Sequence, residues 1–473
     1  MLTYLYKIPL PVHHKDEKSK MKKLRVLMLG WEDQPILNGG VGKACFHLAE
    51  AMAKQVELTM IVPQADHIAL DQHAEVVGLN SLDLTEVKQA PIAKTFERFA
   101  TTHRVPAALF PYEDPNVYYT GGAQEEEVEL DEETVSSLEN TAAPTEAPKA
   151  AETTFSDGKP EIKIVSGAKG TMNFEVIQFA RYAARLASHK QIDVVYAHDW
   201  MTFLAGMEIK TQLKVPLVVH VHSLSFDRQV GEPLGWVYEL ENKALHEADM
   251  ILTVSERTAR MISKRYGVSA KKIKVIYNGA DRVAPSAVTS TKRKQVTFLG
   301  RLVAQKGPLQ FLKVAKQVLK KDPEVRFVVA GHGPQYEEAQ QMMRRLGIED
   351  AVTFTGFLPP AQAEALLKNS SVFCLPALSE PFGLAALEAT QAGLPVVITH
   401  QTGAAEVLPE ASVADCNDTE GLAEHILQLL QDKTLRKKQV EANQRAVQKL
   451  TWESTADQIM ESLHHVLLLQ EQN

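Results

Sequence analysis

Short apolar segments alternate along the chain with longer stretches whose apolar residues recur every three or four positions. The short segments are rich in β-branched residues, which is typical of strands in a parallel sheet covered on both faces. They form two series, at residues 24–29, 57–62, 192–197, 217–221, 250–254 and 273–277 and then at 296–299, 326–330, 352–355, 372–375, 396–399 and 412–414. We therefore predict an α/β protein with two Rossmann-like, doubly wound domains that face each other across a cleft.

Two of the predicted helices have distinctive sequences. Residues 384–392 are apolar or small on nearly every side, which predicts a buried helix, and Gly393 before Pro395 ends it. Pro381 suits its first turn. This helix carries Glu388, and burial of a carboxylate is costly unless it has a partner. Residues 452–469 form an amphipathic helix that we expect to pack on a neighbour.

Length and composition are those of a globular protein with more than one domain. The chain has 473 residues, 45% of them apolar and 23% charged, which is too long for a single core. No stretch approaches the ~20 apolar residues of a membrane span, and the first twenty residues lack the apolar core of a secretory signal. Cys45, Cys374 and Cys416 show no disulfide or metal spacing. We expect a cytoplasmic protein without an integral membrane segment.

The net charge of −8 is concentrated in one segment. Residues 125–146 contain nine acids and no Lys or Arg, and the rest of the chain sums to +1. Nucleic acid is therefore not an expected partner. Residues 121–154 are also rich in Ala, Thr and Pro, so we interpret them as a mobile acidic insertion.

Two acids flank the start of the predicted helix at 384–392. Glu380 precedes this helix, and Glu388 lies on the face that leads back toward it. The amides of Phe382, Gly383 and Leu384 lie at the positive end of the helix dipole, where anions bind. Acids beside an amide nest favour a ligand with both hydroxyls and phosphates, such as a nucleotide sugar. The alternative is that Glu388 is a buried acid paired with a distant Arg or Lys.

Two further loops contain candidate ligand-binding residues. Arg301 and Lys306 lie five residues apart in the loop after the first strand of the second series, where they can converge on a diphosphate. Gly39 and Gly40 lie in the turn after the first strand of the chain, and glycines there let the backbone approach a phosphate or an acceptor. This turn is neither a dinucleotide fingerprint nor a Walker loop.

Histidines follow two strands of the first series. His198 lies at a strand end, so we expect it to point into the cleft, whereas Asp199 caps or orients the next helix. His220 and His222 lie on one side of their strand. Their spacing suits a metal, but no third ligand is apparent, so we interpret them as acceptor-side lining or structure. Residues 227–228 are a further acceptor-site hypothesis.

These segments resemble the retaining glycosyltransferases of the large family-four group, relatives of bacterial glycogen synthases. Glu380 and Glu388 match its E-x₇-E signature, residues 300–307 resemble its G-R-x-x-x-x-K-G motif, and His198 lies in a similar H-D-W segment. Shorter similarities follow in the same order at 38–42, 255–256, 277–281, 331–334 and 402–406. Glycogen synthases usually have a Lys before the paired glycines, where this chain has Leu37-Asn38.

The resemblance implies a GT-B fold and a role for each candidate residue. In this arrangement residues 1–20 are an extension, 21–284 the acceptor-side domain, 285–450 the nucleotide-sugar domain, and 451–473 a helix that crosses back. Glu380 and His198 would contact the donor sugar, and Glu388 would hold the nucleotide ribose. Arg301 and Lys306 would neutralise the leaving diphosphate. Catalysis would need no metal or other cofactor.

The resemblance predicts a hexosyltransferase. Its donor would be a nucleoside diphosphate sugar, glucose being the favoured hexose, and its acceptor a carbohydrate. The H-D-W segment favours an α-glucan as that acceptor. Three alternatives stay open: a nucleotide-sugar 2-epimerase of the same fold, a glycosyltransferase acting on a lipid or small molecule, and a non-catalytic glycan-binding protein. An epimerase would release sugar without an acceptor, whereas a binding protein would not need Glu380, Arg301 and Lys306.

Overall fold

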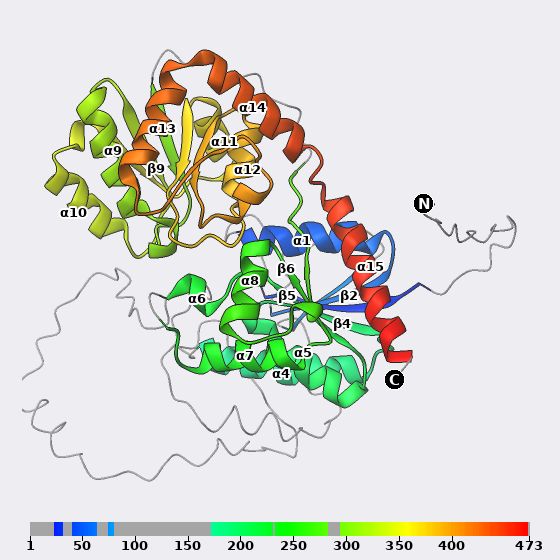
Figure 1. Cartoon of the computed structure of the whole chain (residues 1–473). Helices are drawn as coiled ribbons and strands as arrows, with labels where there is room; N and C mark the ends of the chain where they lie inside the picture. Colours follow the sequence, from blue (N-terminus) through cyan, green and yellow to red (C-terminus); the bar gives the residue numbers. More distant parts are fainter. Residues whose placement is uncertain are drawn as a thin grey trace, which may run out of the picture.

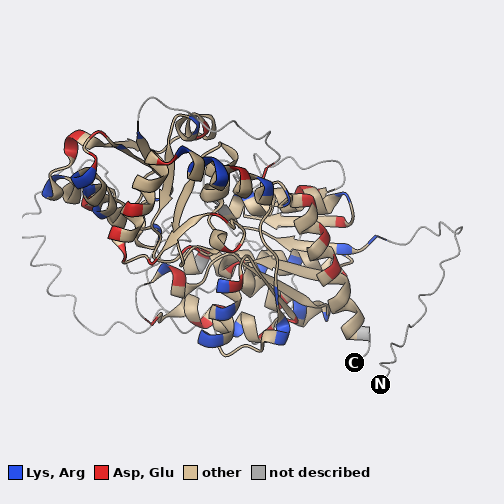
Figure 2. Cartoon of the chain, turned by 45° about the horizontal axis from the view of Figure 1, so that its top comes forward, with Lys and Arg blue, Asp and Glu red and all other residues tan. Residues whose placement is uncertain are grey.

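The computed structural model describes residues 23–31, 40–63, 74–79, 172–229, 232–281 and 294–471. The predicted extension, the acidic insertion and Gly39 lie outside these residues. Among the described residues, no helix is both long and apolar enough to cross a membrane. Figure 2 shows basic and acidic segments side by side on the helices of both domains.

The first domain is built on a seven-stranded parallel sheet with strand order β3-β2-β1-β4-β5-β6-β7. Six of its strands match the predicted segments within about two residues, which confirms the first series. The unpredicted β3 is a half-exposed edge strand whose second residue is a Glu, so its apolar pattern is weak. The strands are β1 (Arg25–Leu29), β2 (Glu57–Val62), β3 (Ala74–Gly78), β4 (Val194–His198), β5 (Leu217–Val221), β6 (Met250–Thr253) and β7 (Ile273–Val275).

Helices cover both faces of this sheet because its central strands are apolar on both sides. One face packs against α4, α5 and α7, and the other packs against α1 and the last helix of the chain, α15 (Figure 1). The described helices are α1 (Gly40–Ala53), α4 (Met172–Ser188), α5 (Trp200–Leu213), α6 (Ser225–Arg228), α7 (Trp236–Glu247), α8 (Glu256–Arg265) and α15 (Trp452–Glu471).

The second domain has a six-stranded parallel sheet with strand order β10-β9-β8-β11-β12-β13. All six strands were predicted, so two doubly wound domains are confirmed. The strands are β8 (Gln295–Leu299), β9 (Arg326–Ala330), β10 (Val352–Gly356), β11 (Val372–Leu375), β12 (Val396–Thr399) and β13 (Ser412–Ala414). The helices are α9 (Pro308–Lys321), α10 (Tyr336–Leu346), α11 (Pro360–Lys368), α12 (Leu384–Gln391), α13 (Thr419–Gln431) and α14 (Lys433–Val447).

The end of the chain returns to the first domain. Helix α15 lies along α1, and its apolar residues enter the same core as those of α1 (Figure 1). The Trp452 ring stacks on His47 at a centroid distance of 5.3 Å, and Gln55 donates to Asp457 at 2.7 Å. The two domains are therefore joined both by their linker and by this returning helix.

Helix α12 starts at the predicted residue, but Pro381 is not part of it. It begins at Leu384, and Gly383 precedes it with a φ of 101°, a left-handed conformation that glycine adopts without strain. Pro381 therefore lies before the helix, so its predicted place in the first turn is wrong. Ala386, Leu387, Ala389 and Thr390 are buried, whereas the face with Leu384, Ala385, Glu388 and Gln391 is half-buried.

Candidate functional site

The loop after β8 places Lys306 against Glu380. The carbonyl of Gln305 accepts hydrogen bonds from the amides of Leu378 and Ser379 at 2.8 and 3.1 Å. Gly307 has a φ of 72°, and a Cβ atom there would lie 2.0 Å from the Pro376 carbonyl oxygen, so only glycine fits. The two loops are thereby held together, and the Lys306 ammonium forms an ion pair with the Glu380 carboxylate. Two residues predicted for one site do meet there.

The Glu380 segment is also held by the turn at 402–406. The Glu380 amide donates to Gln401 at 2.9 Å, and the Glu380 carbonyl accepts from Gly403 at 2.9 Å. These bonds form an isolated parallel bridge between Glu380 and Thr402. The Glu380 side chain is only 8% exposed, so the protein holds its carboxylate in a buried position.

Glu388 pairs with a lysine from the other domain. Its carboxylate accepts from Lys43 of α1 at 2.7 Å, and the same ammonium lies 2.9 Å from Asp281. Burial lowers the pKa of Lys43, but the carboxylates of Glu388 and Asp281 outweigh burial and raise it. This is the distant cation that the alternative reading of Glu388 required. The sequence reading missed Lys43, although it directly follows the glycine-bearing turn.

His198 is buried in a group of aromatic and imidazole rings. It is the last residue of β4, and its Nδ1 lies 2.9 Å from Nε2 of His222 at the end of β5. Its Nε2 is buried without a hydrogen-bond partner. Burial, and then the neighbouring His222, lower the pKa of His198 well below its usual value, so the ring is neutral. We expected His198 to open into a cleft, but its side chain is only 1% exposed.

The neighbouring histidines are part of this group. The rings of His220 and His222 are stacked 4.4 Å apart, which confirms that both lie on one side of β5. His220 Nδ1 lies 2.6 Å from the Tyr196 hydroxyl, which indicates a structural role for His220. Helix α1 also brings Cys45 to His198 and His222, a neighbour that the sequence pattern does not reveal. The three ligand atoms lie within 4.8 Å of one another.

Asp199 orients the strand ends rather than capping α5. Its backbone has a φ of 56° and its side chain makes no capping bond, although it occupies the position before α5. Its carboxylate accepts from the amides of His222 and Ser223 at 2.6 and 3.3 Å. Burial raises the pKa of Asp199 to about 7, although these two amides oppose that shift.

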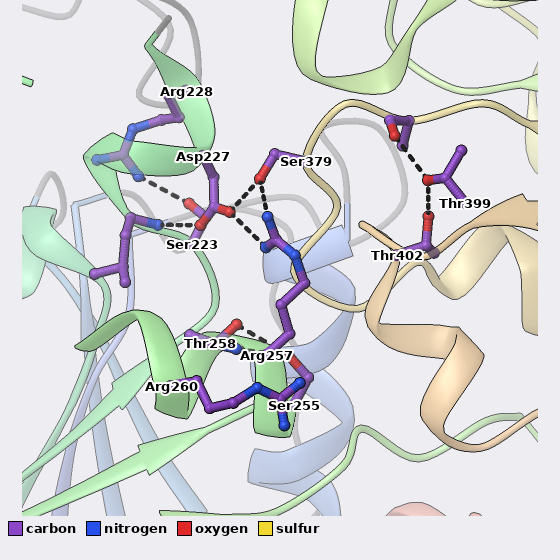
Figure 3. A network of polar contacts seen from close by, with 12 residues as sticks. Ser223, Asp227, Arg228, Ser255, Arg257, Thr258, Arg260, Ser379, Thr399 and Thr402 are labelled. Atoms are coloured by element: carbon purple, nitrogen blue, oxygen red, sulfur yellow. Dashed lines mark hydrogen bonds and ion pairs between the residues drawn. The ribbon is translucent and has the colours of Figure 1, made fainter. Parts of the chain in front are cut away.

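The residues at 227–228 belong to polar networks inside the protein (Figure 3). Asp227 Oδ1 accepts from Ser379 at 2.5 Å and from Arg257 at 3.1 Å, and Arg257 also donates to Ser379 at 2.8 Å. Arg228 forms a buried ion pair with Glu241. Both side chains are engaged within the fold, so the hypothesis that they line an acceptor site is not supported. Asp227 instead ties the first domain to the residue before Glu380.

Glu406 makes a second contact between the domains. Its carboxylate accepts from the amides of Glu256 and Arg257, both at 2.8 Å, at the first turn of α8. Ser255 caps this helix by accepting from Thr258 at 3.1 Å. A carboxylate at a helix start is favourable because it meets free amides and the positive end of the dipole. The similarities at 255–256 and 402–406 therefore meet across the domains.

The other predicted site residues lie in the loops and at the helix starts where the sequence placed them. Arg301 is half-buried in the loop that leaves β8. The Phe382 ring is 3% exposed and stacks on Tyr277 at 6.2 Å, so only its backbone is suited to bind a ligand. Gly40 is the first residue of α1, and the Leu384 side chain is half-buried at the start of α12.

Family models match two adjoining parts of the chain. Residues 142–283 match the model described as Glycosyltransferase Family 4, and residues 282–446 match Glycosyl transferases group 1. The second match contains Arg301, Lys306, Glu380 and Glu388.

Curated relatives of several kinds are similar to this chain. Glycogen synthase of Mycobacterium tuberculosis is 29% identical over 275 residues, which are 56% of this chain and 66% of the relative. D-inositol 3-phosphate glycosyltransferase of Kribbella flavida is 29% identical over 259 residues, 49% of this chain and 61% of the relative. The chain thus spans less than two thirds of the length of these relatives.

Solved structures show the same fold over nearly the whole chain. Sucrose-phosphate synthase from Thermosynechococcus elongatus superposes with a TM-score of 0.64 at 17% identity, covering 94% of this chain and 100% of that one. HepE of Anabaena, in complex with UDP-glucose, gives 0.60 at 18% identity, covering 93% and 99%. The two domains of the chain therefore match glycosyltransferase family models, and the chain has the GT-B fold of these structures.

Proposed function

We propose that this protein transfers a hexose, with glucose favoured, from a nucleoside diphosphate sugar to a carbohydrate acceptor with retention of configuration. The observation that carries the proposal is the contact between Lys306 and Glu380, built by two loops at the strand ends of the second domain. Glu388 lies on the next helix and faces the first domain through Lys43. Cations and acids in this arrangement suit a ligand with phosphates at one end and hydroxyls along its length.

The proposed reaction has an oxocarbenium-like transition state and a departing diphosphate. Arg301 and Lys306 would offset the charge that grows on the diphosphate, which is where fixed cations lower a barrier most. Glu380 and His198 would position the donor sugar, and contact with the buried His198 would require its surroundings to open. No metal is needed in this scheme, because the two cations supply the electrostatic stabilisation.

Glu388 is proposed to hold the nucleotide ribose. Its carboxylate already accepts from Lys43, so ribose hydroxyls would share or replace that contact when the donor binds. Each carboxylate has about four acceptor sites, which leaves room for both partners. Donor binding and the contact between the domains would then be coupled through one side chain.

An α-glucan is the proposed acceptor. Its support is the H-D-W segment around His198 and the similarity to glycogen synthase, while an equal similarity to an inositol-phosphate glycosyltransferase makes that acceptor the main competitor. The test incubates the protein with UDP-glucose, ADP-glucose or GDP-glucose and either maltooligosaccharides, glycogen or inositol phosphate. Released nucleotide and chain lengthening are measured together, and NMR of the product gives the anomeric configuration.

The possible outcomes test the acceptor, the transferase activity and the donor separately. Lengthened glucans with α-linkages support it in full. Transfer only to inositol phosphate or a lipid would end the glucan assignment and keep the transferase assignment. Release of free sugar without any acceptor would favour a nucleotide-sugar epimerase. A donor at ~100 times its dissociation constant adds ~2.7 kcal/mol to the stability, so the donor assignment fails if none of the three nucleotide sugars stabilises the protein.

A further inference from the structure

A cluster of soft ligands lies where α1 crosses the carboxyl ends of β4 and β5. Cys45 of α1 meets His198 and His222, and one ligand atom from each lies within 4.8 Å of the others. All three side chains are buried, with exposed fractions of 5%, 1% and 6%. The proposed transfer reaction uses His198 but gives Cys45 and His222 no role.

The donor set has the chemistry of a zinc site. A thiolate and two imidazoles are ligands that Zn²⁺ binds in tetrahedral geometry, with a fourth position left for water. A second, independent observation points to a ligand: His198 Nε2 is fully buried and has no hydrogen-bond partner. Such orphaned polar atoms are rare in folded proteins.

We propose that Cys45, His198 and His222 bind Zn²⁺, each through one side-chain atom. Binding converts the Cys45 thiol to a thiolate and releases its proton to solvent. The two imidazole rings already lie close together, with their centroids 5.2 Å apart.

The metal would inhibit the enzyme. A zinc ion bound to His198 occupies the side chain that is proposed to contact the donor sugar, so zinc and donor exclude each other. This consequence rests on the proposed function, whereas zinc binding itself does not. The site would make the transferase sensitive to the free zinc concentration.

The test uses the full chain, freed of affinity tags and metals, and titrates it with Co²⁺ as a spectroscopic substitute for Zn²⁺. Binding through Cys45 gives a thiolate-to-cobalt charge-transfer band in the near ultraviolet, together with the visible bands of a tetrahedral ion, and Zn²⁺ abolishes both. Cys45→Ser should lose the charge-transfer band and weaken binding by at least the 10–100-fold that loss of even an outer-shell partner gives. Cys416→Ser is the matched control, because Cys416 is also buried but lies in the second domain.

Each outcome decides a part of the proposal. A cobalt spectrum without a thiolate band, or a band that persists in Cys45→Ser and disappears in Cys416→Ser, overturns the site. If Cys45→Ser unfolds, Cys45→Ala and His222→Ala repeat the test, with thermal melting as the check of folding. Zinc that inhibits wild type and Cys45→Ser equally overturns the inhibitory role. Binding without any transferase activity would leave the site intact and count only against the proposed function.

Discussion

At the level of single residues, the pair of Lys306 and Glu380 is expected to act both in catalysis and in stabilising the fold. Mutations can separate these two roles. Lys306→Ala should lower kcat/KM about 100-fold, since losing one fixed donor to a developing charge costs about 3 kcal/mol. It should also destabilise the fold by about 1–3 kcal/mol, because the buried Glu380 loses its ion-pair partner. The double variant Lys306→Ala, Glu380→Gln should regain much of that stability but no activity. The exposed Lys313→Ala serves as control.

An ordinary rate in Lys306→Ala would remove Lys306 from the reaction. Arg301→Ala should show the same loss of rate, because both cations are proposed to face the diphosphate. Urea unfolding and initial rates, measured on the same preparations, distinguish a lost catalytic charge from a damaged fold.

Substitutions of the two acids of the E-x₇-E pair should affect different steps, one the binding of nucleotide and the other the transfer of the sugar. Glu388→Gln should weaken binding of free nucleotide and nucleotide sugar alike, by about 10- to 150-fold, because a hydrogen bond to a charged group contributes about 1.5–3 kcal/mol. Glu380→Gln should spare free nucleotide and slow the sugar transfer. Calorimetric titration with each ligand makes the measurement. Lys43→Met is the control, because it breaks the same ion pair but keeps the Glu388 carboxylate.

The raised pKa of Asp199 should make the stability of the fold fall as the pH rises. Its pKa is about 7 in the folded protein and near 3.8 when unfolded, so the folded state holds this proton more tightly. Its contribution is therefore greatest below about pH 4 and is lost as the pH rises toward 7. Between pH 5 and pH 8 the stability of wild type should fall by about 2–3 kcal/mol relative to Asp199→Asn. Urea unfolding at the two pH values tests this, and the exposed Asp350→Asn should show no such change.

At the level of elements, Gly307 fixes the loop before α9 to the segment that contains Glu380. Gly307→Ala should shift this loop, because its Cβ would lie 2.0 Å from the Pro376 carbonyl oxygen, and should reduce both stability and transfer rate. Gly347 is the matched control: it also has a left-handed φ, 60°, but has open space around it. Gly347→Ala should cost only the ~1–2 kcal/mol of left-handed strain and leave the rate unchanged. Equal effects of the two variants would show that the loop contact is unimportant.

At the level of the whole molecule, Glu406 helps to hold the two domains together. Glu406→Ala removes the acceptor of two amides at the start of α8, so the ligand-free protein should open. Small-angle X-ray scattering should show a larger radius of gyration, and donor should reduce it again. Glu424→Ala is the control, because Glu424 pairs with Lys321 within the second domain. An unchanged radius in Glu406→Ala would mean that other contacts set the closed arrangement.

The sequence by itself determined the local structure and the local motifs. Twelve of the described strands were predicted, because short apolar segments rich in β-branched residues are typical of strands buried in a parallel sheet. The meeting of Lys306 with Glu380 followed from their motifs, since both lie at strand ends of one sheet. The same local signals missed β3, which is an edge strand with a polar residue, and placed Pro381 inside a helix that begins at Leu384.

Only the tertiary structure decided which distant residues become partners. Lys43 reaches Glu388 across 345 positions and Asp227 reaches Ser379 across 152, and both contacts depend on how the domains dock. Cys45 meets His198 and His222 because α1 crosses the ends of β4 and β5. A periodic pattern shows which face of an element is buried but not which element covers it. Contacts between elements are set by the packing of the whole chain, and that packing made His198 a buried residue.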